Sequence, residues 1–325
     1  MRTVAIIDDM LPNALLLKSY MKRINDIEAL TFTDPVEALA RCGEVVPDLV
    51  LLDYRMPNMD GVEFLRRFRA TQRLKDVPVI MITGEEGKEA LYEALSAGAN
   101  EFLRKPVDDF ELITRVHNLL ELRARQIELA KANEQLYVLA TTDQLTKLKN
   151  RRFFFEKLEF EVERSGRYSR PCSLAMIDAD RFKAVNDSYG HDAGDRVLQA
   201  LAQTLLTELR TVDQVGRVGG EEFAVLLPET NDDQAMGVCQ RLMARIRVAR
   251  VKVETKEIGF TVSIGLTGIG WAGDMADAVL KRADQALYRA KELGRDRCEV
   301  AKPPESVLRS FADFGSSSGL APRKA

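Results

Sequence analysis

In the first 120 residues, short apolar segments alternate with amphipathic segments. Short, continuous apolar runs occupy residues 3–7, 28–32, 48–52, 78–83 and 101–103. Between them lie amphipathic stretches with helical spacing, such as residues 62–70 and 90–99, and Gly98 would close the second of these. Because such alternation is typical of a parallel sheet with helices on both faces, we predict a doubly wound, flavodoxin-like α/β domain of five strands over residues 1–120.

Residues 108–141 contain neither glycine nor proline and predict one long helix, continuous with the last helix of the first domain. Two heptad tracks run along it. The first comprises Leu119, Leu122, Gln126, Leu129, Asn133, Leu136 and Ala140, and the second, weaker track comprises Ile113, Val116, Leu120, Arg123, Ile127, Ala130, Glu134 and Tyr137. The first track has leucine at every d position and polar residues at a, which predicts a parallel dimeric coiled coil. A solvated connecting helix is the alternative.

The pattern changes after residue 141. Strand-like runs occupy residues 172–178, 214–218, 222–227, 259–269 and 297–300, helical patterns occupy 195–209, 232–249 and 275–293, and a loop is expected between 178 and 195. This order predicts an α+β, ferredoxin-like domain with additions over residues 142–302. Gly219 and Gly220 are expected to form a tight hairpin turn with positive φ. Residues 303–325 are rich in Pro, Ser and Gly and are expected to be disordered.

Composition narrows the class of protein. A chain of 325 residues is long enough for about two domains, and a net charge of −3 does not indicate a nucleic-acid binder. The four cysteines form no CxxC pair, so we expect neither a disulfide framework nor a zinc site. The first apolar run is too short for a signal peptide, and no run approaches the length of a membrane span. These features predict a cytoplasmic protein.

Polar residues follow the predicted strands of the first domain. Asp8 and Asp9 follow the first strand, Asp53 follows the third, Thr83 ends the fourth and Lys105 follows the fifth. Open α/β sheets place their chemistry at the carboxyl ends of strands, and carboxylate oxygens suit Mg²⁺. The set therefore favours phosphoryl transfer to Asp53. Any one of these residues alone could be a helix cap or a surface charge.

The same residues resemble those of a response-regulator receiver domain. The matching stretches are residues 8–9, DYRMPNMDG at 53–61, Thr83, and Lys105 with Pro106. The resemblance implies phosphorylation of Asp53 by a partner histidine kinase, with Mg²⁺ held by Asp8, Asp9, Asp53 and the backbone carbonyl of Arg55. It also implies a cis bond before Pro106 and a switch made of Thr83, Phe102 and Lys105. Phe102 could equally be a plain core residue.

Two adjacent glutamates stand out in the second domain, within RVGGEEF at residues 217–223. Glu221 and Glu222 would repel one another unless a cation offset their charge. If the hairpin that carries them lies beside the end of strand 172–178, they could share Mg²⁺ with Asp178. An exposed hairpin with solvated acids is the alternative. Nearby, Lys183 could reach a phosphate, and a carboxylate could read the N1 and N2 donors of guanine.

The second domain resembles the GGDEF family of diguanylate cyclases. The matching stretches are residues 143–152, 176–195, 217–223 and 283–296. The resemblance implies that two monomers face each other and condense two GTP into cyclic di-GMP, releasing two pyrophosphates. The residue roles that it implies are Asp178, the Ala179 carbonyl and Glu221 as Mg²⁺ ligands, Glu222 as a catalytic residue or further ligand, Lys183, Lys291 and Arg295 as phosphate contacts, and Asn186 and Asp195 as guanine contacts.

A product site is also implied. Arg210 and Asp213 form an RxxD pattern just before the glutamates, which in this family is an inhibitory site for cyclic di-GMP, and Arg241 is a candidate second contact. A salt bridge at a helix end is the alternative for this pattern.

Three functions are therefore weighed. The first is a homodimeric diguanylate cyclase activated by phosphorylation, in which the receiver would select one of the two heptad tracks. The second is a non-catalytic response regulator that binds cyclic di-GMP and signals through its coiled coil. The third is a cyclase with another nucleotide preference, which Asn186 and Asp195 oppose. Neither nucleic acid nor membrane is expected as a partner.

Overall fold

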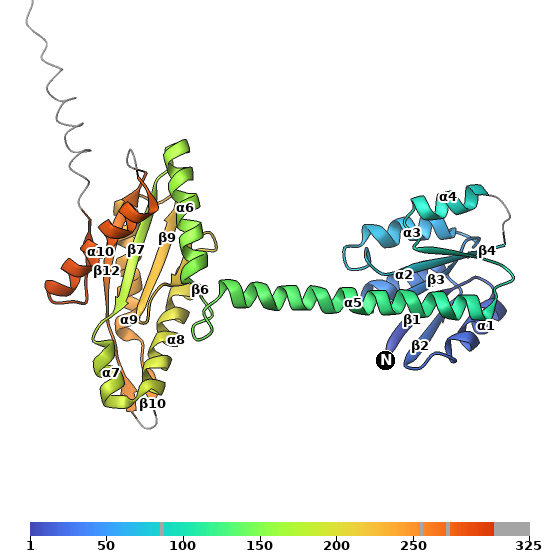
Figure 1. Cartoon of the computed structure of the whole chain (residues 1–325), viewed down its shortest axis with the longest axis horizontal. Coiled ribbons are helices and arrows are strands. Elements are labelled where there is room, and N and C mark those ends of the chain that lie inside the picture. The colour runs from blue at the N-terminus through green and yellow to red at the C-terminus, as the bar shows by residue number, and fades with distance from the viewer. Residues whose placement is uncertain (85–87, 254–255, 271–273, 302–325) are drawn as a thin grey trace, which may run out of the picture. The chain divides into compact units, whose positions relative to one another are not determined.

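The computed structural model describes residues 1–84, 88–253, 256–270 and 274–301. The chain divides into two compact units, Met1–Glu134 and Gln135–Ala325 (Figure 1). The predicted disorder of residues 303–325 concerns residues outside the described ones. Among the described helices, none combines the length and the apolar character needed to cross a bilayer.

The first unit is built on a five-stranded parallel sheet of order β2-β1-β3-β4-β5. Its strands are β1 (Arg2–Ile7), β2 (Ile27–Phe32), β3 (Leu49–Asp53), β4 (Val79–Thr83) and β5 (Glu101–Arg104). Its helices are α1 (Leu11–Met21), α2 (Pro35–Glu44), α3 (Gly61–Ala70), α4 (Lys88–Ser96) and the first part of α5 (Asp109–Thr141). The predicted doubly wound fold is confirmed, and Gly98, with φ of +102°, follows α4 as expected.

Helices cover both faces of this sheet. Along β1, Val4 and Ile6 pack with α1 and α5, whereas Ala5 and Ile7 pack with α2, α3 and α4. Successive side chains of a strand point to opposite faces, so a continuous apolar run is required when both faces are covered. This explains the continuous apolar runs in β1, β3 and β4, the three central strands of the sheet.

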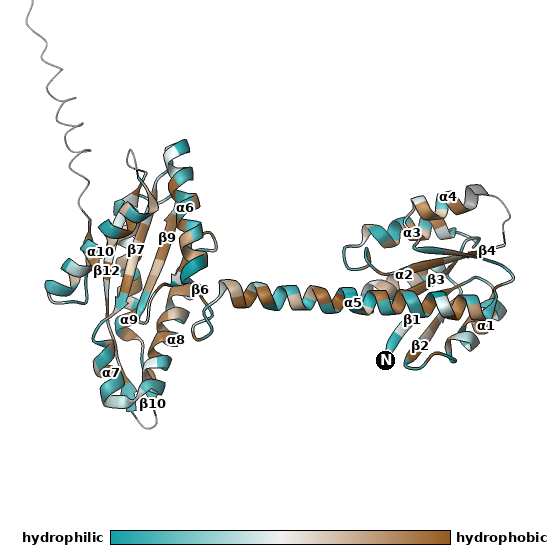
Figure 2. Ribbon diagram, in the orientation of Figure 1, coloured by the Kyte–Doolittle hydropathy of each residue, from teal (hydrophilic) through white to brown (hydrophobic). Residues whose placement is uncertain are grey.

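The predicted connector is one helix, α5, of 33 residues. Hydrophobic residues recur along it (Figure 2). Leu122, Leu129 and Leu136, which share a d position, are 53%, 62% and 62% exposed. Large apolar side chains repeated on one track of an exposed helix are typical of a helix that pairs with another. The coiled coil itself stays a prediction.

The second unit contains a six-stranded sheet of order β13-β12-β7-β9-β8-β6. Its strands are β6 (Lys149–Asn150), β7 (Cys172–Ala179), β8 (Gln214–Arg217), β9 (Glu222–Pro228), β12 (Val262–Ile269) and β13 (Cys298–Val300). The helices are α6 (Arg151–Tyr168), α7 (Phe182–Tyr189), α8 (His191–Glu208), α9 (Asp232–Val248) and α10 (Ala276–Glu292). The four central strands, β12-β7-β9-β8, have the ferredoxin-like order that was predicted.

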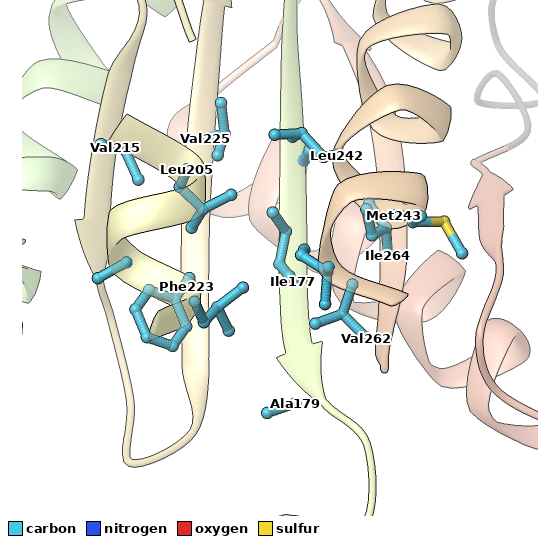
Figure 3. Packing of buried hydrophobic residues seen from close by; sticks show 14 of the residues in the cluster. Ile177, Ala179, Leu205, Val215, Phe223, Val225, Leu242, Met243, Val262 and Ile264 are labelled. Atoms are coloured by element: carbon cyan, nitrogen blue, oxygen red, sulfur yellow. The ribbon is translucent and has the colours of Figure 1, made fainter. Parts of the chain in front are cut away.

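Two apolar clusters sandwich the sheet of the second unit. α8 and α9 pack on one face and α6 and α10 on the other. Figure 3 shows the first cluster, in which Ile177 of β7, Phe223 of β9 and Val262 of β12 meet side chains of α8 and α9. This packing fixes the ends of β7 and β9, where the acidic residues lie.

Three local expectations for the second unit were wrong or incomplete. The expected loop between residues 178 and 195 contains α7, and α8 begins at His191, because Gly190, with φ of +82°, separates two helices without a longer break. Gly219 and Gly220 do not have positive φ. A two-stranded ribbon of β10 (Val251–Val253) and β11 (Lys256–Ile258) was not anticipated.

Candidate functional site

Three carboxylates of the first unit lie together at the carboxyl ends of β1 and β3. Ligand oxygens of Asp8, Asp9 and Asp53 lie within 4.8 Å of one another. Lys105 binds two of these acids, with its Nζ 2.7 Å from Asp53 Oδ1 and 3.1 Å from Asp8 Oδ2. The sequence prediction of an acidic cluster with a facing lysine agrees with this geometry.

The loop after β3 returns close to the backbone of Asp53. A Cβ added at Gly61 would lie 2.4 Å from the Asp53 carbonyl oxygen, so only glycine allows the loop to pass this close. Thr83 is buried at the end of β4, and Phe102 is partly buried on β5. Arg55 is exposed in the loop. The predicted cis bond between Lys105 and Pro106 is confirmed.

The charge of the cluster is only partly compensated. Burial raises the pKa of Asp53, Lys105 opposes this through a hydrogen bond and its charge, and the charges of Asp8 and Asp9 raise the pKa further. For Lys105, burial lowers the pKa, but the hydrogen bonds and charges of Asp53 and Asp8 outweigh it and raise the pKa overall. One lysine therefore leaves an excess of negative charge, as expected of a site for a divalent cation.

In the second unit, β7 and β9 bring the predicted acids together. Asp178 and Glu222 are direct partners across the two antiparallel strands, so their side chains lie on one face of the sheet. The backbone N–H of Ala179 donates to the Glu221 carbonyl at 3.2 Å. A Cβ at Gly219 would lie 2.3 Å from Glu222 Oε2, so a larger residue there would displace the end of the Glu222 side chain.

A lysine from α10 completes this acidic set. Lys291 Nζ lies 2.7 Å from Asp178 Oδ2, and Asp178 is 4% exposed. Burial raises the pKa of Asp178, Lys291 lowers it, and Glu222 raises it further. Burial also raises the pKa of Glu221, and the charge of Asp178 adds to this effect. Within the described residues, these acids are not grouped as tightly as those of the first unit.

The predicted base contacts lie where α7 meets α8. Asn186 belongs to α7 and the exposed Asp195 to α8. The Asn186 Oδ1 atom is buried and has no hydrogen-bond partner. A Cβ at Gly194 would lie 1.9 Å from this oxygen, so glycine makes room for it. A buried polar atom without a partner is costly unless a ligand completes it.

The predicted phosphate contacts come from two helices. Lys183 is exposed in the first turn of α7. Lys291 lies in the last turn of α10, and the exposed Arg295 follows that helix. Lys291 and the acids thus form one constellation, and Arg295 lies four residues beyond Lys291.

Of the three residues predicted for a product site, Arg210 and Asp213 lie together and Arg241 does not join them. Asp213 Oδ2 accepts from the backbone N–H of Arg210 at 2.8 Å, so the pair forms a turn. The Arg210 side chain lines a groove that also contains Arg164 and Arg170. Arg241 instead pairs with Glu208, at 3.4 Å. The structure therefore does not place Arg241 in the groove of Arg210.

Sequence reasoning missed two groups of residues near the acids. Asp180, two residues after Asp178, is buried and accepts three hydrogen bonds. Arg217 donates to the Gly220 carbonyl at 2.7 Å and to Asp143 at 3.2 Å, which ties the hairpin turn to the segment that follows α5. The alternation Asp-x-Asp at residues 178–180 was the available signal for Asp180.

Comparisons with known proteins agree with this geometry. The model of the response regulator receiver domain matches residues 4–117, and that of the diguanylate cyclase GGDEF domain matches residues 140–297. The chain is 35% identical over 267 residues to response regulator PleD of Caulobacter vibrioides, which covers 81% of this chain and 58% of PleD. It is 37% identical over 188 residues to diguanylate cyclase A of Treponema denticola, covering 57% of this chain and 51% of that protein.

Among solved structures, the chain is similar to the coiled coil and GGDEF domain of DgcB from Caulobacter crescentus, a structure in complex with c-di-GMP. The TM-score is 0.55 and the identity 28%, over 58% of this chain and 100% of that one. This chain spans only 58% and 51% of the two curated relatives. Both family models nevertheless match, in the same order along the chain as the two structural units. The chain therefore belongs to the response regulators in which an N-terminal receiver domain is joined to a C-terminal GGDEF domain.

Proposed function

We propose that the chain is a diguanylate cyclase that condenses two GTP into cyclic di-GMP and two pyrophosphates. The observation that carries the proposal is the pairing of Asp178 with Glu222 across β7 and β9, with Lys291 bound to Asp178. A protein that had lost catalytic activity would have no need to keep these two acids and this lysine together. The family of the relatives and the structure solved with c-di-GMP support the same reaction.

The residues fit a bound Mg²⁺. Three acids face one lysine, and the raised pKa values of Asp178 and Glu221 show that the lysine compensates their charge incompletely. Asp178, the Ala179 carbonyl, Glu221 and Glu222 would hold the ion. When bound, Mg²⁺ would neutralise charge on the phosphates and polarise the α-phosphate for attack. Lys183, Lys291 and Arg295 would bind the remaining phosphate oxygens.

Guanine is the base that fits the α7–α8 junction. The unpartnered Asn186 Oδ1 can accept a hydrogen bond from the base, and the Asp195 carboxylate can accept from the N1 and N2 donors. Adenine carries no such donor pair on this edge. We therefore expect a preference for GTP over ATP.

The reaction requires two chains. The 3′-hydroxyl oxygen of each GTP would bond to the α-phosphorus of the other, each α–β phosphate bond would break, and each hydroxyl proton would leave through a base such as Glu222. Each chain holds one reactant, so the dimer must bring the two half-sites face to face. Orientation of this kind corresponds to effective molarities of about 10⁵ M or more.

We propose that the receiver controls this orientation. A histidine kinase would phosphorylate Asp53, with Mg²⁺ held by Asp8, Asp9, Asp53 and the Arg55 carbonyl, and Lys105, Thr83 and Phe102 would respond to the phosphoryl group. The change would pass along α5 by favouring one of its two heptad tracks. Cysteines placed at positions 129 and 127 test this step. Identical crosslinking at both positions with and without phosphorylation would contradict it.

Product inhibition is the last part of the proposal. Arg210 is exposed in a groove that also contains Arg164 and Arg170. Glu161 and Glu229 pair with these two arginines, so Arg210 is the arginine we expect to bind a phosphate of cyclic di-GMP. Asp213 fixes the Arg210 backbone. Arg241 would join the product only after leaving Glu208.

The deciding experiment is incubation of the chain with Mg²⁺ and GTP or ATP, with and without beryllofluoride as a phosphoryl mimic on Asp53. Pyrophosphate and the nucleotide product are measured. We expect cyclic di-GMP from GTP, faster with the mimic, and little product from ATP. If GTP yields no pyrophosphate in either state, the cyclase proposal is wrong, and the non-catalytic receptor of cyclic di-GMP becomes the better reading.

A further inference from the structure

The turn that follows α10 is held in an unusual backbone conformation. Gly294, Arg295 and Asp296 have φ of +113°, +66° and +48° in succession. Glycine adopts this region without cost, but Arg and Asp rarely do, and such residues persist only where their surroundings hold them. Arg295 is exposed, so its own side chain contributes no packing that would offset the strain.

A buried carboxylate holds the turn from one side. Asp180, 8% exposed, accepts from Ser263 Oγ at 2.6 Å, from Thr261 Oγ1 at 2.7 Å and from the backbone N–H of Asp296 at 3.0 Å. Ser263 and Thr261 anchor this carboxylate to β12 and to the residue before it. The strained turn is thereby tied to the sheet through Asp180.

A guanidinium group holds the turn from the other side. Arg247, near the end of α9, donates through Nε to both carboxylate oxygens of Asp296, at 2.8 and 2.9 Å. Its Nη2 donates to the Asp296 carbonyl at 3.0 Å. Three bonds to one residue fix both the side chain and the backbone of Asp296.

We propose that Asp180 and Arg247 are positioning residues that hold the 295–296 turn so that Arg295 is presented to the phosphates of GTP. The inference rests on the proposed function. Asp180 follows the Asp178–Ala179 segment directly, so one stretch of chain would supply the metal ligands and also set the phosphate-binding arginine. Arg295 and Lys291 would then act together from the end of α10.

The test uses Arg247→Ala, Arg247→Lys and, as a matched control, Arg245→Ala. Arg245 lies on the same helix and loses a comparable ion pair, with Glu208 at 3.1 Å, but does not touch the turn. The dissociation constant of 3′-deoxy-GTP, which lacks the attacking hydroxyl, is measured by calorimetry in the presence of Mg²⁺. Arg247→Ala is expected to raise this constant about tenfold, because relaxation of the turn misplaces Arg295. Arg247→Lys should recover part of the loss, and Arg245→Ala should bind like the wild type.

A double-mutant cycle asks whether Arg247 acts through Arg295. If it does, Arg247→Ala combined with Arg295→Ala binds 3′-deoxy-GTP no more weakly than Arg295→Ala alone. In steady-state kinetics, the GTP concentration for half-maximal rate should rise in Arg247→Ala while kcat stays within about twofold. Additive losses in the cycle would overturn the inference.

Asp180→Ala is the second test variant. Its affinity for 3′-deoxy-GTP is measured, and its melting temperature shows whether it folds. It should weaken binding at least as much as Arg247→Ala, and if it fails to fold, the Arg247 variants decide alone. Wild-type affinity in both Asp180→Ala and Arg247→Ala would overturn the inference while leaving the cyclase intact. A wild-type chain that neither binds 3′-deoxy-GTP nor makes product would instead overturn the proposed function, and the inference with it.

Discussion

The two acidic sites of this chain use the same parts in different arrangements. In each, a lysine Nζ lies 2.7 Å from a buried aspartate, Lys105 from Asp53 and Lys291 from Asp178. In each, burial keeps the pKa of the aspartate raised despite the lysine. Only in the receiver, among the described residues, do three acids bring their ligand oxygens within 4.8 Å of one another.

The closer grouping of the receiver acids follows from the strands that carry them. Asp8 and Asp9 follow β1, and Asp53 is the last residue of β3. These adjacent parallel strands pair Ile7 with Leu52, so their carboxyl ends meet at one edge. In the GGDEF domain, Asp178 is the second-last residue of β7, whereas Glu221 lies in the hairpin turn between β8 and β9. We expect a site made of strand ends to be in place before metal binds, and a site that includes a hairpin turn to depend on the phosphates of the nucleotide for further Mg²⁺ ligands. We therefore expect the receiver to bind Mg²⁺ alone and the cyclase site to bind it together with GTP.

The largest expected effect is on catalysis. Asp178→Asn and Glu222→Gln should each lower the rate of pyrophosphate release from GTP by about 100- to 1,000-fold or more, because each removes a carboxylate that would hold the Mg²⁺ that balances the charge of the phosphates. Glu257→Gln, at an exposed position of β11, is the control. Near-normal turnover in Asp178→Asn would show that the pairing across β7 and β9 is not the active centre.

The next effect concerns coupling between the domains. Asp53→Asn should abolish the response to beryllofluoride, which we expect to be about tenfold in the wild type, a usual size for coupling between sites. The basal rate should change little, since Asp53 lies outside the GGDEF domain. The ratio of rates with and without the mimic is the measurement, and Asp76→Asn, an exposed receiver residue, is the control. A response that survives in Asp53→Asn would place the activating event elsewhere.

A smaller effect is expected at the product site. Arg210→Ala should raise the cyclic di-GMP concentration that halves the initial rate by about tenfold, through loss of a charge-assisted bond. The rate at low product should stay the same. If wild type and variant give equal inhibition curves, the groove of Arg210 is not the inhibitory site.

The smallest effect is on the free energy of unfolding. It tests the acidic site of the receiver without an activity measurement. A raised pKa means that the folded state holds the Asp53 proton more tightly than the unfolded state does. Stability is therefore lost as pH rises from the ordinary aspartate pKa through the raised native one. Without divalent ions, Asp53→Asn should be more stable than the wild type at pH 7, and the gain should vanish below the ordinary aspartate pKa, where Asp53 is protonated in both the folded and the unfolded state. Denaturant titrations at several pH values measure this. A gain that persists at low pH would contradict the pKa assignment.

The parts of this molecule that sequence predicted well are those set by local pattern. The receiver strands and their acids followed from continuous apolar runs, and the ferredoxin-like order followed from the sequence of elements. The ion pair of Lys291 with Asp178 joins two residues that lie 113 positions apart in the sequence. This pair arises from a tertiary contact, which no local pattern contains. α7 was not predicted because one residue, Gly190, separates it from α8, and the polar residues around it were interpreted as a loop.

Metal binding tests most directly the central claim that the receiver site is preformed whereas the cyclase site is completed by GTP. Mn²⁺ can replace Mg²⁺ and be followed by electron paramagnetic resonance, with and without 3′-deoxy-GTP. We predict that Asp53→Asn removes the Mn²⁺ binding seen without nucleotide, and that Asp178→Asn removes only the additional binding seen with nucleotide. Loss of nucleotide-free Mn²⁺ binding in Asp178→Asn, equal to that in Asp53→Asn, would contradict the claim.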